Sequence, residues 1–397
     1  MVNNCESRYR WYVLGLGALT YMCAIAMPRM CMPVLFKEIS IDLGLSLVQI
    51  GGIWGTEFLS GIITGIAGGL LGDRFGIRRV LSIACLLAGG AGALRGLSSG
   101  FTSLTATTFL FGFILGAIPV NVVKTVGIWF SGRHLGLANG ITGVGMAIGF
   151  MAGSMLSATV LSPLLGGWRW VLLLYGTLSA VISVLWFFTV KEPGQAVSGG
   201  FKSRLTLGQT FMRVFRLKSV WLLGLALAGH SGCINSMLGY LPLYLRERGW
   251  PVAGADGTVA AFHGVSMLGT IPLALLSDRF RSRKTVLIPA VLITAASVAL
   301  LSVAHDQTVW LFVILAGLFR DGFMAIILSM VIEVKGVGAD YAGTATALVL
   351  AVSRLGGFVG PPLGNGLAGF HPGLPFVFWG ALALITPISL YLVKEQR

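Results

Sequence analysis

Long apolar runs separated by short polar or charged breaks dominate this sequence. A membrane-spanning helix needs about 20 mostly apolar residues. Strands of a membrane barrel need only about 10 residues that alternate in polarity, and these runs are longer and continuous. We therefore expect an all-α membrane protein with twelve transmembrane helices. Their approximate bounds are 11–35, 47–71, 79–98, 105–130, 137–161, 169–190, 219–245, 258–276, 284–304, 308–333, 342–369 and 373–393.

Composition supports the membrane assignment, and the positions of the basic residues explain the net charge. Apolar residues make up 55% of the chain, charged residues only 11%, and the mean hydropathy is +0.87. The net charge of +14 could indicate a nucleic-acid partner, but on the span map nearly all basic residues fall on one side. By the positive-inside rule that side is the cytoplasm. We expect no nucleic-acid binding, an even number of spans, and both termini in the cytoplasm of a multi-pass protein of the cell (plasma or inner) membrane.

The first apolar run is too long for the core of a cleaved signal peptide, so we expect it to be the first span. The longest polar stretch, 191–218, separates two groups of six spans. This predicts an N-terminal six-helix bundle over 1–190, a cytoplasmic linker over 191–218 and a C-terminal six-helix bundle over 219–397. The end of the linker, 205–218, is basic and amphipathic, and we expect it to lie on the anionic inner leaflet.

A motif occurs twice, each time after the second span of a half. Residues 68–80 read GGLLGDRFGIRRV and residues 273–286 read LALLSDRFRSRKTV. Such a repeat indicates two bundles related by an axis along the membrane normal. The motif resembles the loop signature of the major facilitator superfamily of transporters, and the resemblance covers the whole chain. It is carried by Gly69, Leu71, Asp73, Arg74, Gly76, Arg78 and Arg79 in the first copy and by Leu276, Asp278, Arg279, Arg283 and Lys284 in the second.

The resemblance implies two pseudo-symmetric bundles that rock about a central site, with Asp73 bracing the start of the eleventh span in the outward-open state. We expect a conformational latch that does not touch substrate, formed by Gly69, Asp73, Arg74, Arg78, Arg79, Asp278 and Arg279. A loop that serves topology alone would explain the arginines but not the aspartate. Two glycine rows also resemble the superfamily and are predicted to allow backbone contact between the halves. They are Gly140, Gly143, Gly145, Gly149 and Gly153 in the fifth span and Gly356, Gly357, Gly360 and Gly364, with Pro361 and Pro362, in the eleventh.

Charged residues inside the spans indicate the substrate. A charge near mid-membrane costs about 2.5 to 3.5 kcal/mol, so it faces a cavity or a partner. The candidates are Arg29, Glu57, Lys124, Arg320, Asp321, Glu333 and Arg354, on spans that line the central cavity in the superfamily. The excess of cations favours an anion, and the planar guanidinium suits a carboxylate. We expect Arg29, Lys124, Arg320 and Arg354 to bind a small organic carboxylate; Arg29 and Arg354 also resemble basic residues of organic-anion carriers.

Several alternatives stay open for these residues. Arg29 and Lys124 could instead extend to opposite membrane interfaces. Glu57 and Asp321 are the candidate proton carriers, although Glu57 could be a fixed counter-ion of Arg29. Arg320 and Asp321 are neighbours about 100° apart on a helix, so we expect them not to pair, and Asp321 could pair with Arg354. In the seventh span, we expect three polar residues to contact the substrate or relay protons: His230, Asn235 and Tyr240. These side chains could instead belong to a gate hinge.

Motifs for a phosphate-binding loop, a metal cluster or a nucleophile are missing from the sequence, so we expect neither an enzyme nor a bound cofactor. Energy must then come from an ion gradient, with protons the first choice. The sequence predicts a secondary active transporter that moves a small organic anion by alternating access with proton symport, as a monomer among membrane lipids. The alternative is proton-driven efflux of a cationic or hydrophobic compound, for which Glu57 and Asp321 would be the binding acids.

Overall fold

The computed structural model describes residues 4–130, 132–191, 212–280 and 282–393, and all the regular structure in these ranges is helical. Ten helical stretches are long and apolar enough to cross a membrane. The shorter apolar helix Lys284–Leu300 and the helix Leu47–Phe75 complete the twelve spans. The predicted all-α class is therefore confirmed. We call the end of each span that the positive-inside rule assigns to the cytoplasm its inner end.

The chain forms two compact units: unit 1 comprises Met1–Leu45 and Ser60–Gly200, and unit 2 comprises Ser46–Leu59 and Phe201–Arg397. Unit 1 contains α1 (Asn4–Thr20), η1 (Tyr21–Ala26), α2 (Met27–Leu43), the later part of α3 (Leu47–Phe75), α4 (Ile77–Arg95), α5 (Phe101–Leu115), α6 (Ala117–Trp129), α7 (Arg133–Leu156), η2 (Ser157–Leu161), α8 (Ser162–Leu165) and α9 (Trp168–Thr189). The elements η1 and η2 are short π-helices.

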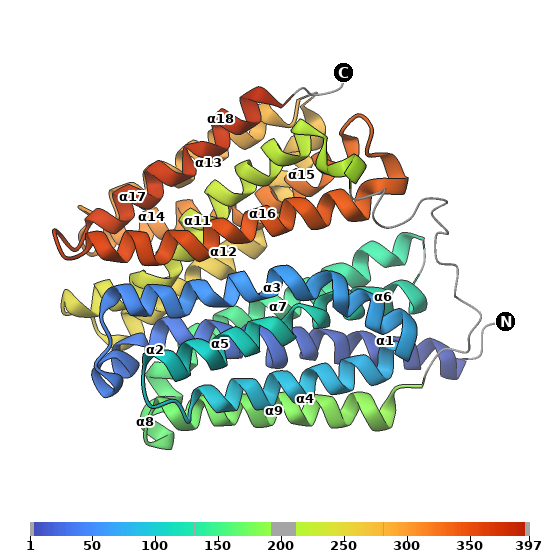
Figure 1. The fold of residues 1–397 in the computed structure, drawn as a ribbon, viewed down its shortest axis with the longest axis horizontal. Helices are drawn as coiled ribbons and strands as arrows, with labels where there is room; N and C mark the ends of the chain where they lie inside the picture. Colours follow the sequence, from blue (N-terminus) through green and yellow to red (C-terminus); the bar gives the residue numbers. More distant parts are fainter. Residues whose placement is uncertain (1–3, 131, 192–211, 281, 394–397) are drawn as a thin grey trace. The chain divides into compact units, whose positions relative to one another are not determined.

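Unit 2 contains the first part of α3, α11 (Lys218–Glu247), α12 (Val252–Arg279), α13 (Lys284–Leu300), α14 (Gln307–Leu318), α15 (Arg320–Glu333), α16 (Gly338–Leu367), α17 (Leu374–Ala383) and α18 (Ile385–Leu392) (Figure 1). Residues 192–211 of the predicted linker lie outside the described residues. The predicted bounds of the bundles and the linker therefore stay predictions.

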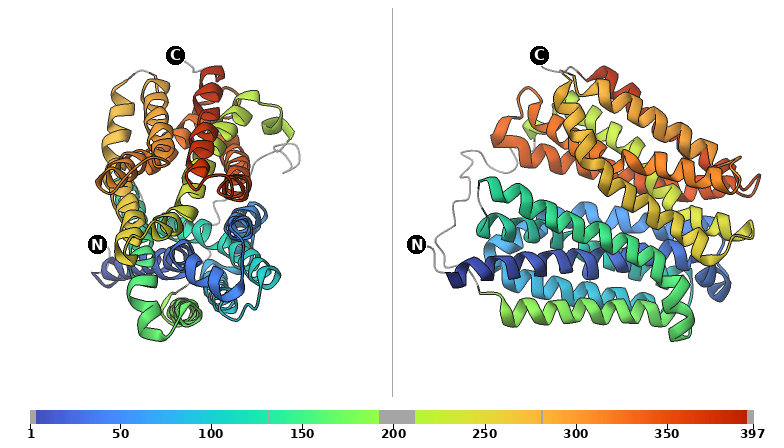
Figure 2. Two further views of the ribbon diagram at one scale, coloured as in Figure 1. Left: turned by 90° about the vertical axis from the view of Figure 1, so that its left-hand side faces the viewer. Right: turned by 180° about the vertical axis from the view of Figure 1, so that it is seen from behind.

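In unit 1, α4 and α9 run side by side, as Figure 1 and the back view in Figure 2 show. Their backbones meet at two glycines. A Cβ atom added to Gly89 would lie 2.6 Å from the carbonyl oxygen of Gly176, and the reverse distance is 2.7 Å. The hydroxyl of Ser179 also donates to the carbonyl oxygen of Cys85 at 2.7 Å. Small residues thus allow the close approach on which membrane helix packing depends.

The glycine row of α7 packs against the first span within unit 1. A Cβ atom on Gly145 would lie 2.6 Å from the carbonyl oxygen of Ala18, and one on Gly153 would lie 2.8 Å from the backbone of Met27. Gly143, in the same row, has open space around its Cβ position. In unit 2, Gly356 of α16 meets the carbonyl oxygen of Ala228 on α11. These glycines serve contacts within a unit, so the expectation that they join the two halves was wrong for them.

The first span bends between η1 and α2, where Pro28 occupies the first turn of α2. Arg95, the last residue of α4, is fully buried and stabilises this bend. Its Nη2 donates to the carbonyl oxygen of Pro28 at 2.8 Å, and its guanidinium lies 3.9 Å from the ring centre of Phe111. A neighbouring helix therefore satisfies the backbone at the bend, one residue before Arg29.

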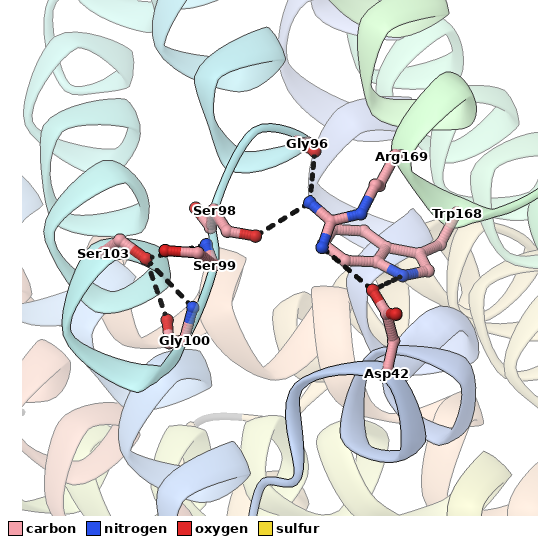
Figure 3. A network of polar contacts seen from close by, with 8 residues as sticks. All are labelled: Asp42, Gly96, Ser98, Ser99, Gly100, Ser103, Trp168 and Arg169. Carbon is pink, nitrogen blue, oxygen red and sulfur yellow. Dashed lines mark hydrogen bonds and ion pairs between the residues drawn. The ribbon is translucent and has the colours of Figure 1, made fainter.

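An exposed ion pair joins three helices at the outer end of unit 1 (Figure 3). Arg169, at the start of α9, contacts Asp42 of α2 at 2.9 Å, and their side chains are 38% and 47% exposed. The same guanidinium donates to the carbonyl oxygens of Gly96 and Ser98, beyond the end of α4, at 2.9 and 2.8 Å. Trp168 adds an indole N–H donated to Asp42 at 3.2 Å. These bonds tie the outer ends of α2, α4 and α9 together.

Unit 2 has a buried ion pair at its outer end. Arg246, in the last turn of α11, contacts Asp256 in the early part of α12 at 2.5 Å. The two side chains are only 5% and 0% exposed. Each unit thus has an Arg–Asp pair at its outer end. The pair in unit 1 is exposed, and the pair in unit 2 is buried.

Candidate functional site

Among the described helices, three spans break near their middles, and two of these are the fourth spans of their halves. Span 4 breaks at Gly116, between α5 and α6, and span 10 breaks at Phe319, between α14 and α15. Interrupted helices at corresponding positions of two repeats are a pointer to the binding site of a transporter. The last span also breaks, at Leu384, but its counterpart α9 is continuous.

The break in span 10 has a different cause from the other two. Pro119 follows Gly116 by three residues and Pro387 follows Leu384 by three, and proline lacks the N–H that a helix needs. The run from Phe319 to Glu333 contains no proline. There the N–H of Asp321 donates to the hydroxyl of Ser266 on α12 at 3.2 Å. A side chain from a neighbouring helix has entered the hydrogen-bond ladder and interrupted it.

Close packing of α12 holds that hydroxyl in place. Gly269 of α12 lies against the carbonyl oxygen of Leu318, the last residue of α14, and a Cβ atom there would overlap it. The first intrahelical bond of α15 runs from the N–H of Phe323 to the carbonyl oxygen of Phe319 at 2.8 Å. Arg320 marks the midpoint of the span Gln307–Glu333, about 20 Å from either end at 1.5 Å per residue. A helix therefore starts in the middle of the membrane.

Arg320 and Asp321 form an ion pair at this helix start. Nη1 of Arg320 lies 3.0 Å from Oδ1 of Asp321, and the side chains are 21% and 39% exposed. The hydroxyl of Ser266 donates to Oδ2 of the same carboxylate at 2.6 Å. The expectation that these two residues do not pair was wrong. It assumed a continuous helix, whereas Arg320 is the first residue of α15 and follows the break.

His230, in the middle of α11, lies beside this ion pair. Its ring stacks on Phe323, with centroids 4.1 Å apart and planes 30° apart, and its side chain is buried. Phe323 lies in the first turn of α15, two residues after Asp321, so the imidazole lies beside the start of that helix. Among the described residues, neither ring nitrogen has a hydrogen-bond partner. We call His230, Ser266, Arg320, Asp321 and Phe323 the α15 cluster.

The structure thus brings together three predicted site residues, His230, Arg320 and Asp321, in unit 2. Sequence reasoning missed Ser266 and Phe323. A lone serine in an apolar span carries no local signal, and its partner Asp321 is 55 residues away. Phe323 is a buried aromatic residue like many others in the spans.

Two other residues predicted from the seventh span have backbone partners. The side-chain amide of Asn235 donates to the carbonyl oxygen of Ser231 at 2.8 Å. The backbone carbonyl oxygen of Asn235 accepts the indole N–H of Trp54, within unit 2, at 2.8 Å. The hydroxyl of Tyr240 donates to the carbonyl oxygen of Pro372 at 3.2 Å. Its buried ring lies among aromatic rings of α11 and α17. We therefore leave Tyr240 out of the site we propose below.

The remaining charges predicted inside the spans lie in both units. Arg29 and Lys124 belong to unit 1, and Glu57 and Arg354 belong to unit 2. Glu57 is 5% exposed, whereas the other three are partly buried. All four have an interaction partner in the structure. Their roles in substrate and proton binding stay predictions.

The motif loops lie at the inner ends of α3 and α12. Arg74, Arg79, Asp278 and Arg279 are exposed, and Nη1 of Arg78 donates to the carbonyl oxygen of Val190 at 3.4 Å. Gly69 and the side chain of Asp73 lie outside the parts of the chain that the structure describes. The latch therefore stays a prediction. Nearby, Arg283 holds Glu333 by two bonds, of 2.9 and 2.6 Å. Glu333 is thus paired with Arg283. It lies at an inner end, as its place in the sequence predicts, and apart from the α15 cluster.

Comparison with known proteins decides the family. The sequence profile of the Major Facilitator Superfamily matches residues 16–269 and 254–397, nearly the whole chain. The chain belongs to the Major Facilitator Superfamily. As a member of this superfamily it is a multi-pass membrane transporter and not an enzyme.

The chain is similar to two relatives and to one solved structure over most of its length. It is 27% identical to a probable nitrate/nitrite antiporter of Thermus thermophilus, over 96% of this chain and 90% of that protein. It is 24% identical to a probable galactarate/D-glucarate transporter of Bacillus subtilis, over 99% of this chain and 95% of that protein. A bacterial homologue of the human lysosomal transporter Spinster, in an inward-facing and occupied conformation, has the same fold. The TM-score is 0.80 at 17% identity, over 97% of each chain.

Proposed function

We propose that this transporter moves a small organic anion, a carboxylate, across the membrane by alternating access coupled to proton symport. The observation that carries the proposal is the charge inside the spans. Four cations, Arg29, Lys124, Arg320 and Arg354, stand against two acids, Glu57 and Asp321. An anion would offset the excess positive charge in a setting of low dielectric constant, where such pairs are stronger than in water.

The relatives support an anionic substrate. Of the two relatives reported above, one is a probable antiporter of nitrate and nitrite and the other a probable transporter of galactarate and D-glucarate. Nitrate is inorganic and the sugar acids are organic, but both classes are anions. Guanidinium groups bind planar carboxylates through paired hydrogen bonds, so a carboxylate fits the arginines of this chain.

In the proposed cycle, Arg29, Arg320 and Arg354 compete for the substrate anion. A carboxylate, Glu57 or Asp321, or a histidine carries the proton. A proton crossing 100 mV gains about 2.3 kcal/mol, which corresponds to roughly fortyfold accumulation at 1.4 kcal/mol per factor of ten. We further place both termini in the cytoplasm of a cell-membrane protein that works as a monomer.

One observation favours the alternative of proton-driven efflux of a cationic compound. Glu57 is almost fully buried, and Trp54, one helical turn before it, packs edge to face on Phe58 at 5.6 Å. A buried acid beside aromatic rings would suit a lipophilic cation. The two functions therefore differ in the sign of the ligand charge.

A thermal-shift screen of the detergent-purified protein tests the proposal. Carboxylates, sugar acids, inorganic anions and lipophilic cations are compared at two pH values. A ligand at a hundred times its Kd adds about 2.7 kcal/mol to the stability of the native state. We expect stabilisation by a carboxylate, stronger at the lower pH. The effect should be lost in Arg29→Gln and kept in Arg216→Gln, which removes the same charge from an exposed position outside the spans. Stabilisation by cations alone would overturn the proposal in favour of efflux.

A further inference from the structure

The α15 cluster contains an acid, Asp321, beside the cation Arg320. We propose that the substrate carboxylate binds at the start of α15 by replacing Asp321 on Arg320, and that the released Asp321 takes up one proton from water. This inference rests on the proposed function. It assigns the coupling to Asp321 rather than Glu57 and fixes the ratio at one proton for each carboxylate.

The start of α15 already binds a carboxylate, because Asp321 occupies it. Oδ1 of Asp321 lies 3.0 Å from Nη1 of Arg320, and Oδ2 accepts the hydroxyl of Ser266 at 2.6 Å. The first turn of a helix attracts negative charge, since its N–H groups point toward the helix start. A guanidinium, a hydroxyl and a helix N-terminus together form a binding site for an anionic group, and Asp321 acts as its internal ligand.

A second, independent observation points to a ligand at this place. His230 is 3% exposed and neither of its ring nitrogens has a hydrogen-bond partner among the described residues. Buried polar groups in proteins are nearly always hydrogen-bonded, and an exception requires an explanation. Because the imidazole stacks on Phe323, in the first turn of α15, we place it beside an anion bound at the helix start, which would offer it an acceptor. His230 would then be a substrate contact and not a structural residue.

Exchange of one carboxylate for another explains why a proton must enter. Two ionised carboxylates at one guanidinium repel each other, and protonation of one removes the repulsion. Asp321 is the one that can reach water, since its side chain is 39% exposed. The contact from Arg320 to Asp321 breaks, the contact from Arg320 to the substrate forms, and an O–H bond forms on Asp321. The proton leaves a hydronium ion of the solvent, whose O–H bond breaks, and the hydroxyl of Ser266 exchanges Asp321 for the substrate as its acceptor. A bound monocarboxylate and the proton together add no net charge.

The neighbouring helices add few other titratable groups at this depth. Those that pack against α15 are α11, α12, α13, α14 and α16. Their mid-span titratable or charged residues are His230 and Cys233 on α11, His263 on α12 and Arg354 on α16, whereas α14 has none and Lys284 starts α13 at its inner end. Asp321 is therefore the one acid at mid-depth on these helices and α15, within the described residues.

Isothermal titration calorimetry of the full-length protein in detergent tests this exchange. D-glucarate, benzoate and acetate are titrated in two buffers that differ in ionisation enthalpy, which gives the number of protons taken up for each anion bound. We expect about one proton for the wild type. Asp321→Asn should bind the anion with higher affinity and take up none, because its side chain cannot be protonated. Arg320→Gln should lose about tenfold or more in affinity, the scale of a lost charge-assisted bond.

Two control variants separate Asp321 from other acids. Asp42→Asn removes a carboxylate from an exposed Arg–Asp pair in unit 1, and it should still take up one proton. Glu57→Gln should do the same. If Glu57→Gln or His230→Gln abolishes proton uptake while Asp321→Asn retains it, the assignment to Asp321 is wrong.

The outcomes for the wild type distinguish the two proposals. Binding of a carboxylate without proton uptake would overturn this inference and leave anion transport standing. Failure of all three carboxylates to bind would overturn the proposed function, and this inference with it. If Asp321→Asn does not fold, infrared difference spectra of the wild type decide the matter. Anion binding should then produce a protonated carboxyl band, and its absence would refute the exchange.

Discussion

The two Arg–Asp pairs at the outer ends of the units allow a direct test of how burial sets the strength of an ion pair. Arg246 and Asp256 are 5% and 0% exposed at a contact distance of 2.5 Å. Asp256→Asn removes one charge and leaves the guanidinium of Arg246 in the protein interior. Breaking a buried pair in this way costs about 3 to 5 kcal/mol.

The matched control is Asp42→Asn. Arg169 and Asp42 lie 2.9 Å apart with side chains 38% and 47% exposed, and exposed pairs contribute about 0 to 1 kcal/mol. Arg169 also keeps its bonds to the carbonyl oxygens of Gly96 and Ser98 in this variant. The same chemical change should therefore cost about 2 to 5 kcal/mol more at position 256 than at position 42.

Equilibrium unfolding of the detergent-solubilised protein, followed by tryptophan fluorescence, measures both free energies of unfolding. Equal costs for the two variants would refute the reasoning, because burial would then not determine the contribution of the pair. If Asp256→Asn does not accumulate, the double variant Arg246→Met with Asp256→Leu should do so. It removes both charges, and apolar replacement of a whole buried pair is often neutral or stabilising.

Two further predictions use the same unfolding assay. Gly145→Ala places a Cβ atom 2.6 Å from the carbonyl oxygen of Ala18 and should cost about 1 to 3 kcal/mol. Gly143→Ala, in open space on the same helix, should instead stabilise by up to about 1 kcal/mol; equal effects would contradict the packing argument. Arg95→Gln loses the bond to Pro28 and the contact with Phe111, and should cost about 3 kcal/mol. A change below about 1 kcal/mol there would show that the bend in the first span does not need Arg95.

The twelve spans could be predicted from the sequence because the bilayer imposes a simple requirement. Backbone polar groups in lipid must be hydrogen-bonded inside the protein, which a continuous helix achieves along its length, so each span reads as a long apolar run. The motif at residues 68–80 and 273–286 indicated the two-fold repeat for a similar reason, since a duplicated fold keeps its loops at matching places. The charged residues also indicated the spans in which we propose the site, because charge in a membrane is costly.

The details of the site required the structure. The break at Phe319 comes from Ser266, which is distant in sequence, and no local pattern marks it. The prediction that Arg320 and Asp321 do not pair failed at this point, because it was derived from an uninterrupted helix. The partners of the glycines were mistaken for a related reason. A row of small residues shows that a backbone comes close, but not which backbone it is.

Uptake into proteoliposomes tests the central claim, proton-coupled transport of an organic anion, most directly. The purified protein is reconstituted with an acidic outside and a neutral inside, and accumulation of radiolabelled carboxylates and of a lipophilic cation is compared. We predict accumulation of at least one carboxylate above its outside concentration, abolished when a protonophore collapses the pH gradient. Extrusion of the cation without carboxylate accumulation would contradict the account.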